Sequence, residues 1–444
     1  MSYLKKKWYK PEKLSTKIIF VAVLLLIIRL LSNIPVPFID KTYLSLLFSN
    51  NSAFALLNTF SGGAFTDMTI MALGVTPYIT ASIILQLLCI TFPKLKAIQQ
   101  DTMYGQNKWK IITIFTGIGL GLIQSIGMAL TLGKGGLFSV YNFGSVSLIC
   151  FLWVLGGTIT ILIGEYISKF CVGNGISLIL ASNIIAALPR DIISFWNIYI
   201  QKKSVVDIII ASAVFIAVVF ALIAFTAVLS GAGKDIPVVY PTSRQTTYKN
   251  NTHIPMKLNA AGVMPIIFTS TLFSIPMMFN PYDNKNTIIT AIYDICSAMY
   301  RCNVTSIYWY IGITLSLALV ILFAYFYVSI TINTTEIANR IRKKGGCIPG
   351  IRPGKPTEDY LHNKMKYMTF IGAIILFALT QIPVLVTSFT KINSLTIGGT
   401  SIIIVVGVIM ETALAIKSEH MMHSYNKKGS ASIFGANSVT TMQA

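Results

Sequence analysis

Apolar stretches alternate with short polar ones along almost the whole chain. A helix needs roughly 20 predominantly apolar residues to cross a bilayer, and stretches close to this length recur throughout. The pattern predicts ten membrane-spanning helices, at about residues 18–34, 74–92, 111–132, 145–164, 171–188, 205–229, 258–279, 307–332, 367–388 and 395–416. Pro189 cuts the fifth stretch short. No segment between the stretches could hold a soluble domain, so we expect one integral membrane domain.

Composition agrees with this pattern. Of the 444 residues 54% are hydrophobic and 11% are charged, against roughly 25% charged residues in an average soluble domain. The mean hydropathy is +0.70. The basic N-terminus precedes an apolar stretch that continues into RLLSNIPVPFID without a small-residue cleavage site. We therefore expect an uncleaved first helix rather than a signal peptide.

The positive charges predict how the chain is oriented. The 35 Lys and Arg residues gather mostly in the N-terminal segment and in every second loop after it. By the positive-inside rule, both termini are then cytoplasmic. The net charge of +20 largely reflects this topology. A basic cytoplasmic face would also suit anionic partners or anionic lipid.

A weak internal repeat divides the chain into two halves. Gly-Val-x-Pro begins the second predicted helix at residues 74–77, and it recurs as a break within the seventh at 262–265. Five helices per half make the halves inverted, and inverted repeats with interrupted helices indicate a central pathway. We assign residues 1–200 to the N-terminal half and 201–444 to the C-terminal half. The C-terminal half would carry large cytoplasmic loops at about 230–257 and 333–366.

The predicted pathway is apolar. The third, fourth, seventh, eighth and ninth helices contain no Asp, Glu, Lys or Arg in their centres, whereas coupled transporters generally bury such groups as ion or proton sites. A hydrophobic constriction can instead close a pore by excluding water. This disfavours a secondary transporter but leaves it as an alternative.

Loop sequences carry a family resemblance. GG-x-IPGIRPG-x-x-T-x-x-YL at 345–361 resembles the fifth cytoplasmic loop of the SecY/Sec61-alpha family of protein-conducting channels. Further segments resemble this family in order and spacing: IPVPFID (34–40), FSGGA (60–64), ALGVTPYITASIILQLL (72–88), GNGISLI (173–179), THIPMKLNAAGVMPIIF (252–268) and GGTSIIIVVGVIMET (398–412). The resemblance implies an all-α polytopic membrane protein, with two inverted five-helix halves, a central pore, a short plug helix and a lateral gate.

The resemblance also implies a pore site. In the family, six apolar side chains form a ring that seals around a moving polypeptide. The matching positions here are Val75, Ile79, Ile176, Leu180, Ile267 and Ile404. Uncharged side chains bind no particular sequence and offer ions nothing to replace their hydration. Taken singly, each of the six would also fit ordinary core packing or contact with lipid.

Plug and gate positions follow from the same resemblance. The plug would extend from about residue 57 to 69, with its centre at Phe60, Ser61, Gly62, Gly63 and Ala64. The lateral gate sets the second and third helices against the seventh and eighth, and its polar positions match Gln86 and Asn259. Interhelical hydrogen bonds of such amides contribute about 0.6–2 kcal/mol. Each amide could instead bond to nearby backbone or lie at a wet helix end.

Partners are implied by the family as well. Arg352, in GIRPG, matches the arginine that contacts the motor ATPase SecA or the ribosome, and the flanking Pro and Gly residues would hold it on a shaped turn. Further basic residues could meet an acidic motor surface or ribosomal RNA phosphates: Arg340, Arg342, Lys343, Lys344 and Arg244. Other implied partners are the SecE and SecG subunits and unfolded secretory or membrane polypeptides. The implied location is the bacterial cytoplasmic membrane.

No catalytic motif is apparent. GKGG at 133–136 lacks the spacing of a phosphate-binding loop, and His420 and His423 lack a third ligand for a metal. We therefore expect no enzymatic activity, no cofactor and no metal, and we expect a partner or the membrane potential to supply the energy. The six cysteines form no framework. Cys296 and Cys302 share an outer loop, where they could form a disulfide or remain free.

Two loops depart from the family pattern. FPKLKAIQQDTMYGQNKWK, after the second helix, lacks the acidic element that the family leads us to expect. GAGKDIPVVYPTSRQTTYKNN, after the sixth helix, has fewer arginines than usual. Both loops help to dock partners, so the departures concern partner affinity rather than the channel. They leave open a paralogue that serves an accessory secretion system.

Overall fold

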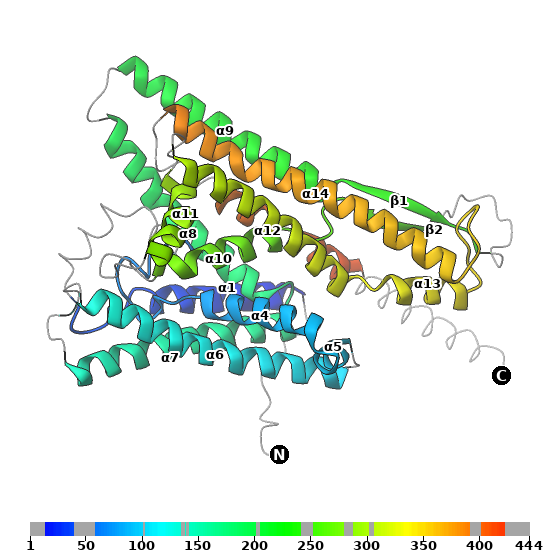
Figure 1. Cartoon of the computed structure of the whole chain (residues 1–444), viewed down its shortest axis with the longest axis horizontal. Helices are drawn as coiled ribbons and strands as arrows, with labels where there is room; N and C mark the ends of the chain where they lie inside the picture. The colour runs from blue at the N-terminus through cyan, green and yellow to red at the C-terminus, as the bar shows by residue number, and fades with distance from the viewer. Residues whose placement is uncertain are drawn as a thin grey trace, which may run out of the picture.

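The structure is a computed structural model that describes residues 14–39, 58–100, 103–134, 138, 142–200, 205–240, 252–278, 287–301, 306–390 and 401–421. Its labelled helices are α1 (Leu14–Leu31), α4 (Thr76–Thr91), α5 (Pro93–Gln100), α6 (Met103–Lys134), α7 (Phe143–Phe170), α8 (Gly175–Ile200), α9 (Val205–Gly231), α10 (Met264–Met278), α11 (Thr287–Arg301), α12 (Ile307–Thr331), α13 (Thr334–Lys343) and α14 (Lys355–Thr390). A further helix covers Ser401–Met421. Each of the ten predicted apolar stretches overlaps one helix of this set (Figure 1).

Several of these helices can span a membrane. Among the described residues, six are long and apolar enough, namely those within α1, α6, α7, α12, α14 and Ser401–Met421. A seventh is obtained if α4 and α5, which are bent by 112° where they meet, count as one span. The apolar parts of α8, α9 and α10 are shorter. The chain is therefore a helical membrane protein, and the count of ten crossings stays a prediction.

Two boundaries differ from the prediction. Helix α8 continues past Pro189 to Ile200, whereas the predicted stretch ended at residue 188. A proline removes one backbone donor, and membrane helices tolerate this because neighbouring groups satisfy the freed carbonyl. Helix α14 begins at Lys355, twelve or so residues before the apolar stretch, because polar residues can continue a helix beyond the lipid.

The prediction of an all-α chain is wrong in one place. Strands β1 (Gly233–Val238) and β2 (Thr252–Lys257) pair antiparallel, with Gly233 opposite Lys257 and Val238 opposite Thr252. Ile236 and Val238 are buried while the residues between and before them are exposed. This alternation is the period of a strand. Prolines at 237 and 255 concealed it in the sequence, and they are tolerated because each strand has an open edge.

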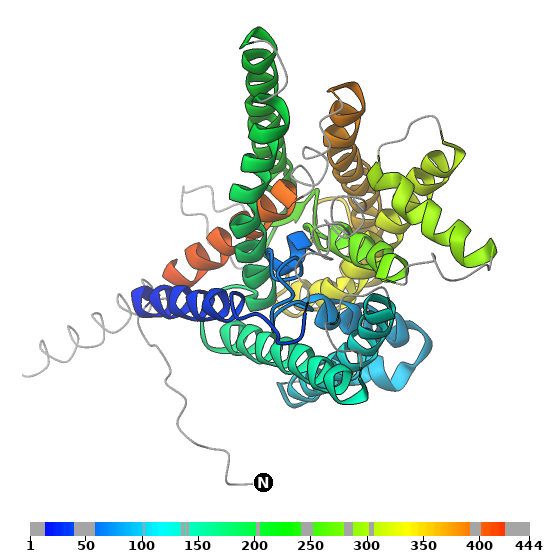
Figure 2. The ribbon, with the colours of Figure 1, turned by 90° about the vertical axis from the view of Figure 1, so that its left-hand side faces the viewer.

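The helices pack mainly within two groups. Helices α1 and α4 to α8 contact one another, and α9 to α14 do likewise, while the main contacts between the groups are α4 with α10 and α8 with α9. Seen from one end, the helices surround a central region into which the segment after α1 runs (Figure 2). Lys17 of α1 forms an ion pair with Glu419, near the end of the last helix. The start of the first helix and the end of the last thus lie together.

Helix α11 lies where the sequence predicted only an outer loop. It packs against α10 and α12 and buries Tyr293, Cys296 and Ser297. Its apolar residues recur at helical spacing, as expected for a helix that covers others with one face. Cys296 is a free thiol, and Cys302, its candidate disulfide partner, lies outside the described residues.

Burial should make the Cys296 thiol react slowly with labelling reagents, and this can be tested. Burial raises the pKa of Cys296 from its ordinary value of 9.0 to about 11. The thiolate is the reactive form, so a shift of this size lowers its population at neutral pH by roughly a hundredfold. In a variant that retains only Cys296, we expect slow maleimide labelling of the folded protein and full labelling after denaturation. Fast labelling of the folded protein would contradict this packing.

Candidate functional site

The repeated Gly-Val-x-Pro sequences have the same backbone geometry in both halves. Gly74 has φ +53° and Gly262 has φ +63°, a left-handed conformation that glycine adopts without steric cost. Pro77 and Pro265 then occupy the second position of α4 and α10, where a missing N–H leaves no helical bond unmade. Each repeat is therefore the start of a helix rather than a break within one.

First-turn hydrogen bonds extend this equivalence to the predicted ring. The Ile79 N–H donates to the carbonyl of Val75 at 3.2 Å, and the Ile267 N–H donates to the carbonyl of Val263 at 3.2 Å. Ile79 and Ile267 thus have the same place on the first turn of α4 and α10. Since α4 and α10 are in contact, the two turns present branched apolar side chains to one central region.

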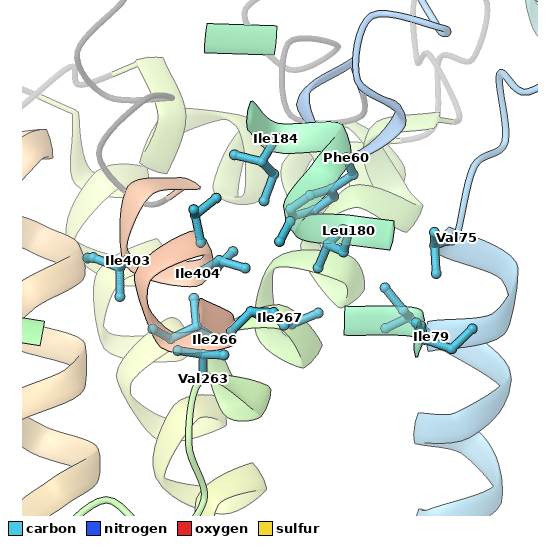
Figure 3. Packing of buried hydrophobic residues seen from close by; sticks show 14 of the residues in the cluster. Phe60, Val75, Ile79, Leu180, Ile184, Val263, Ile266, Ile267, Ile403 and Ile404 are labelled. Atoms are coloured by element: carbon cyan, nitrogen blue, oxygen red, sulfur yellow. The ribbon is translucent and has the colours of Figure 1, made fainter. Parts of the chain in front are cut away.

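All six predicted ring residues lie in one hydrophobic cluster. They are buried, with exposures from 1% for Val75 and Leu180 to 7% for Ile176. Four elements from both halves contribute: α4, α8, α10 and the helix Ser401–Met421. In Figure 3 the labelled side chains approach one another from these separate elements. The side chain of Ile176 also lies against Gly164 of α7.

The predicted plug borders the same cluster. Phe60 is 2% exposed and belongs to it, and Figure 3 shows its ring above Leu180. Of the predicted plug, residues 58–61 are helical and 62–68 form turns, so its helix is very short; residue 57 lies outside the described residues. Internal bonds hold the turns: the Thr66 hydroxyl donates to Asn58 Oδ1 at 2.7 Å, and the Phe65 N–H donates to Ser61 Oγ at 3.0 Å.

Two residues without a role in the sequence prediction contact the plug. Arg29 Nη1 donates to the carbonyl of Gly62 at 3.2 Å, and Asn183 Nδ2 donates to the carbonyl of Phe60 at 2.9 Å. Arg29 Nη2 also donates to Asn183 Oδ1 at 2.7 Å. The sequence offered one signal, an arginine within an apolar helix. Nothing local in the sequence indicates Asn183.

The predicted gate helices are in contact. Helix α4 packs against α10 and α10 against α12, where the rings of Phe268 and Phe323 meet edge to face at 5.8 Å. Gln86 Nε2 donates to Ser82 Oγ of its own helix at 3.0 Å. Asn259 lies in the turn before α10, and within the described part of the chain no hydrogen bond joins it to Gln86. Across the gate, Ile79 and Ile83 of α4 share a buried apolar cluster with Ile267 of α10, so this contact is mainly apolar.

A partly buried carboxylate, that of Glu165, joins three helices of the N-terminal half. The Tyr78 hydroxyl donates to Glu165 Oε1 at 2.7 Å, and Lys110 Nζ lies 3.6 Å from Glu165 Oε2. These residues come from α4, α7 and α6. Gln124 of α6 also reaches Thr80 of α4 at 3.5 Å. Polar bonds thus hold α4 to its own half, whereas its contact with the other half is apolar.

The two loops of the C-terminal half that were predicted to be cytoplasmic fold together. Val239 and Cys347 exchange two backbone hydrogen bonds of 2.9 Å, which joins the end of β1 to the turn after α13. Ile236, Ile341 and Ile348 share one buried cluster beneath them. In Figure 1, β1, β2 and α13 form one end of the molecule.

This end presents the predicted partner-binding residues. Arg352 is exposed on a turn shaped by Gly350 at φ +81° and Gly354 at φ +112°, and its carbonyl accepts from the Thr357 hydroxyl at 2.8 Å. Arg340 pairs with Glu336 at 2.6 Å. The side chains of Arg342, Lys343 and Lys344 are exposed. Arg244 and His423 lie outside the described residues, within which no three His, Cys, Asp or Glu residues group as a metal site.

Comparison with known proteins agrees with this architecture. The family model SecY matches residues 69–413. The protein translocase subunit SecY of Staphylococcus aureus (strain NCTC 8325 / PS 47) is 31% identical over 432 residues, which cover 95% of this chain and 98% of the relative. The subunit of the same name from Staphylococcus epidermidis (strain RP62A) is 32% identical over 434 residues, with the same coverage.

Solved structures share the fold. One described as "The structure of a protein conducting channel" has a TM-score of 0.64 and 17% identity. Sec61 in the canine ribosome-channel complex has a TM-score of 0.61 and 16% identity; each comparison covers 93% of this chain and 95% of the other. The fold is that of the solved protein-conducting channel, and its centre is buried and apolar. The chain belongs to the SecY family.

Polar substitutions in the ring should let ions through. With Ile79 and Ile267 both changed to Ser, hydroxyls replace apolar groups that exclude water. We expect closed-channel ion conductance in planar bilayers to rise on the order of tenfold, which corresponds to about 1.4 kcal/mol of barrier. Ile84→Ser, on an exposed part of α4, is the matched control and should leave the conductance unchanged. Equal conductance for both would contradict the ring assignment.

Proposed function

We propose that this chain is the channel subunit of a Sec translocase in the bacterial cytoplasmic membrane. In this role it passes unfolded secretory polypeptides across the membrane and releases hydrophobic segments sideways into lipid. The observation that carries the proposal is the meeting of the six ring residues, from both halves, in one buried cluster next to Phe60. The near-full-length match to SecY subunits favours this function over a secondary transporter or an accessory paralogue.

The ring would act as a gasket. The ring residues that meet here are all apolar, namely Val75, Ile79, Leu180, Ile267 and Ile404. A passing chain of any sequence could therefore displace them without breaking hydrogen bonds or ion pairs between them. Ions would lose hydration there with no replacement. The segment centred on residues 60–64 would close the path on the outer side while the channel is idle. Both functions need no catalytic group, cofactor or metal.

Sideways release would occur between the two halves. Opening would separate α4 and α6 from α10 and α12, where Ile79 and Ile83 of α4 share a buried apolar cluster with Ile267 of α10. A segment in the open seam would then partition by hydrophobicity. Each Leu or Ile favours the membrane by about 0.3–0.6 kcal/mol, and a central charge opposes entry by about 2.5–3.5 kcal/mol. Gln86 and Asn259 would lie along this seam and adjust the balance.

The exposed basic end would bind the energy source. Arg352 and its basic neighbours on α13 stand on a folded platform, which suits an acidic motor surface of SecA or the phosphates of a ribosome. SecE and SecG subunits and anionic lipid complete the expected assembly. Both termini would face the cytoplasm. The Lys17–Glu419 ion pair supports this by bringing together the start of the first helix and the end of the last, as an even number of crossings requires.

Crosslinking tests the path directly. In a cysteine-free background, a cysteine at position 79 or 267 should form a disulfide with a cysteine in a secretory precursor stalled in membranes that contain SecA. The same change at Ile84, on an exposed part of α4, should give none. Failure at both ring positions, with normal insertion of the protein, would remove the pore assignment.

Charge reversal tests the partner surface. Arg352→Glu should lower SecA-dependent translocation by at least about tenfold, which corresponds to about 1.4 kcal/mol, because a negative charge would face an acidic partner. The complex should still assemble, since the Arg352 side chain is exposed. Lys417→Glu makes the same charge reversal on the last helix and should retain export. Normal export with Arg352→Glu would exclude this role.

A further inference from the structure

The proposed plug is held by side chains from two distant helices. Arg29, in the last turn of α1, donates to the carbonyl of Gly62, and Asn183, in α8, donates to the carbonyl of Phe60. The guanidinium also donates to the Asn183 side-chain oxygen at 2.7 Å. The three bonds form a closed network of α1, α8 and the plug, in which Asn183 both accepts and donates.

The two carbonyls need these outside donors. In the short helical turn 58–61, the carbonyls of Asn58 and Thr59 accept from N–H groups of the plug itself, those of Gly63 and Gly62. The chain then turns, so the Phe60 carbonyl has no succeeding helical turn to supply a donor. Phe60 is 2% exposed, and a buried carbonyl without a partner is costly. Asn183 therefore acts as a cap for the plug.

Gly62 shows how closely the network fits. A Cβ at this position would lie 2.6 Å from Arg29 Nη1, 2.6 Å from Nη2 and 2.8 Å from the Asn183 carbonyl oxygen. The φ angle of Gly62 is +69°, which also favours glycine. The guanidinium thus packs directly on the plug backbone, and only glycine leaves it room.

The buried surroundings of Asn183 favour the position in which the plug closes the channel. Asn183 is 3% exposed and lies next to the fully buried Ile184 in α8. Polar groups at such a site are stable only when they are hydrogen-bonded. With the plug in place, its backbone carbonyls accept one hydrogen bond from Asn183 and one from Arg29. When the plug leaves, water or the backbone of a passing chain must take over these bonds.

We propose that Arg29 and Asn183 are positioning residues that keep the plug next to the six pore-ring residues and so set how readily the channel opens. The inference rests on the proposed function of residues 57–69 as the plug. It adds the residues of the channel wall that hold this segment. Because the bonds end on backbone carbonyls, they act independently of the plug side chains. Because both residues belong to the N-terminal half, the plug is tied to that half.

The test compares closed-channel ion conductance of the assembled complex in planar bilayers. Arg29→Met and Asn183→Leu remove the donors at similar side-chain volume, and each should raise the conductance at least tenfold. Arg29→Lys keeps a cationic donor and should restore a large part of the seal. Gln381→Leu removes an amide of α14 that bonds its neighbour Thr380, and it should leave the conductance unchanged.

A coupling measurement separates the contact from general loss of structure. Gly62→Ala should raise the conductance in the natural background, because its methyl group displaces the guanidinium. It should raise the conductance much less once Arg29→Met has removed that guanidinium, although the strain of Ala at this φ is present in both. If Gly62→Ala raised the conductance by the same factor with and without Arg29→Met, the proposal would be overturned. If the Arg29→Met variant does not assemble, the Asn183→Leu and Gly62→Ala variants provide the test.

Deletion of residues 58–66 distinguishes a failure of the plug assignment from a failure of the positioning role. If the deletion raises the conductance and Arg29→Met and Asn183→Leu do not, the plug stands and the positioning role is wrong. If the deletion also leaves the conductance unchanged, the plug assignment itself fails. A rise with the deletion and both substitutions, reduced with Arg29→Lys, is the result that we expect.

Discussion

The apolar contact at the centre of the molecule is the constraint on which the rest of the structure depends. Ile79 and Ile267 start two helices from opposite halves, and Leu180 and Ile404 complete the cluster between them. In a bilayer, lipid tails are as apolar as these side chains, so helix association there relies on packing and polar bonds. A contact made of branched side chains alone is close enough to exclude water. It lacks the polar bonds that would hold it shut.

The polar bonds described above lie within each half rather than across the seam between α4 and α10. Tyr78, Lys110 and Glu165 join α4, α6 and α7, all in the N-terminal group. Backbone bonds between Val239 and Cys347 hold the C-terminal loops together. These bonds lie within one half each and do not cross from α4 to α10. The seam of α4 with α10 is mainly apolar, and the ion pair of α1 with the last helix lies at another part of the molecule. Separation along the seam would leave most buried polar groups satisfied.

How much of the site was predictable depends on the range of the interactions. The ring positions and the plug segment were predicted from motif resemblance, and the structure brings the ring positions and Phe60 into one cluster. The plug's attachment to Arg29 and Asn183 did not follow, because these residues are 33 and 123 positions from the carbonyls they bind. Gln86 illustrates the opposite case. A gate position was inferred for it, yet in the structure it bonds to Ser82 within its own helix.

The sequence by itself determined the ten apolar segments and the Gly-Val-x-Pro repeat at Gly74 and Gly262, because hydropathy and backbone sterics act over a few neighbouring residues. Tertiary structure decided which helix faces meet at the centre. It also decided that β1 and β2 pair within a basic loop, and that an arginine in an apolar helix finds its acceptor on the plug. These outcomes depend on contacts between distant parts of the chain. Such contacts form only when whole helices pack, and no local pattern specifies them.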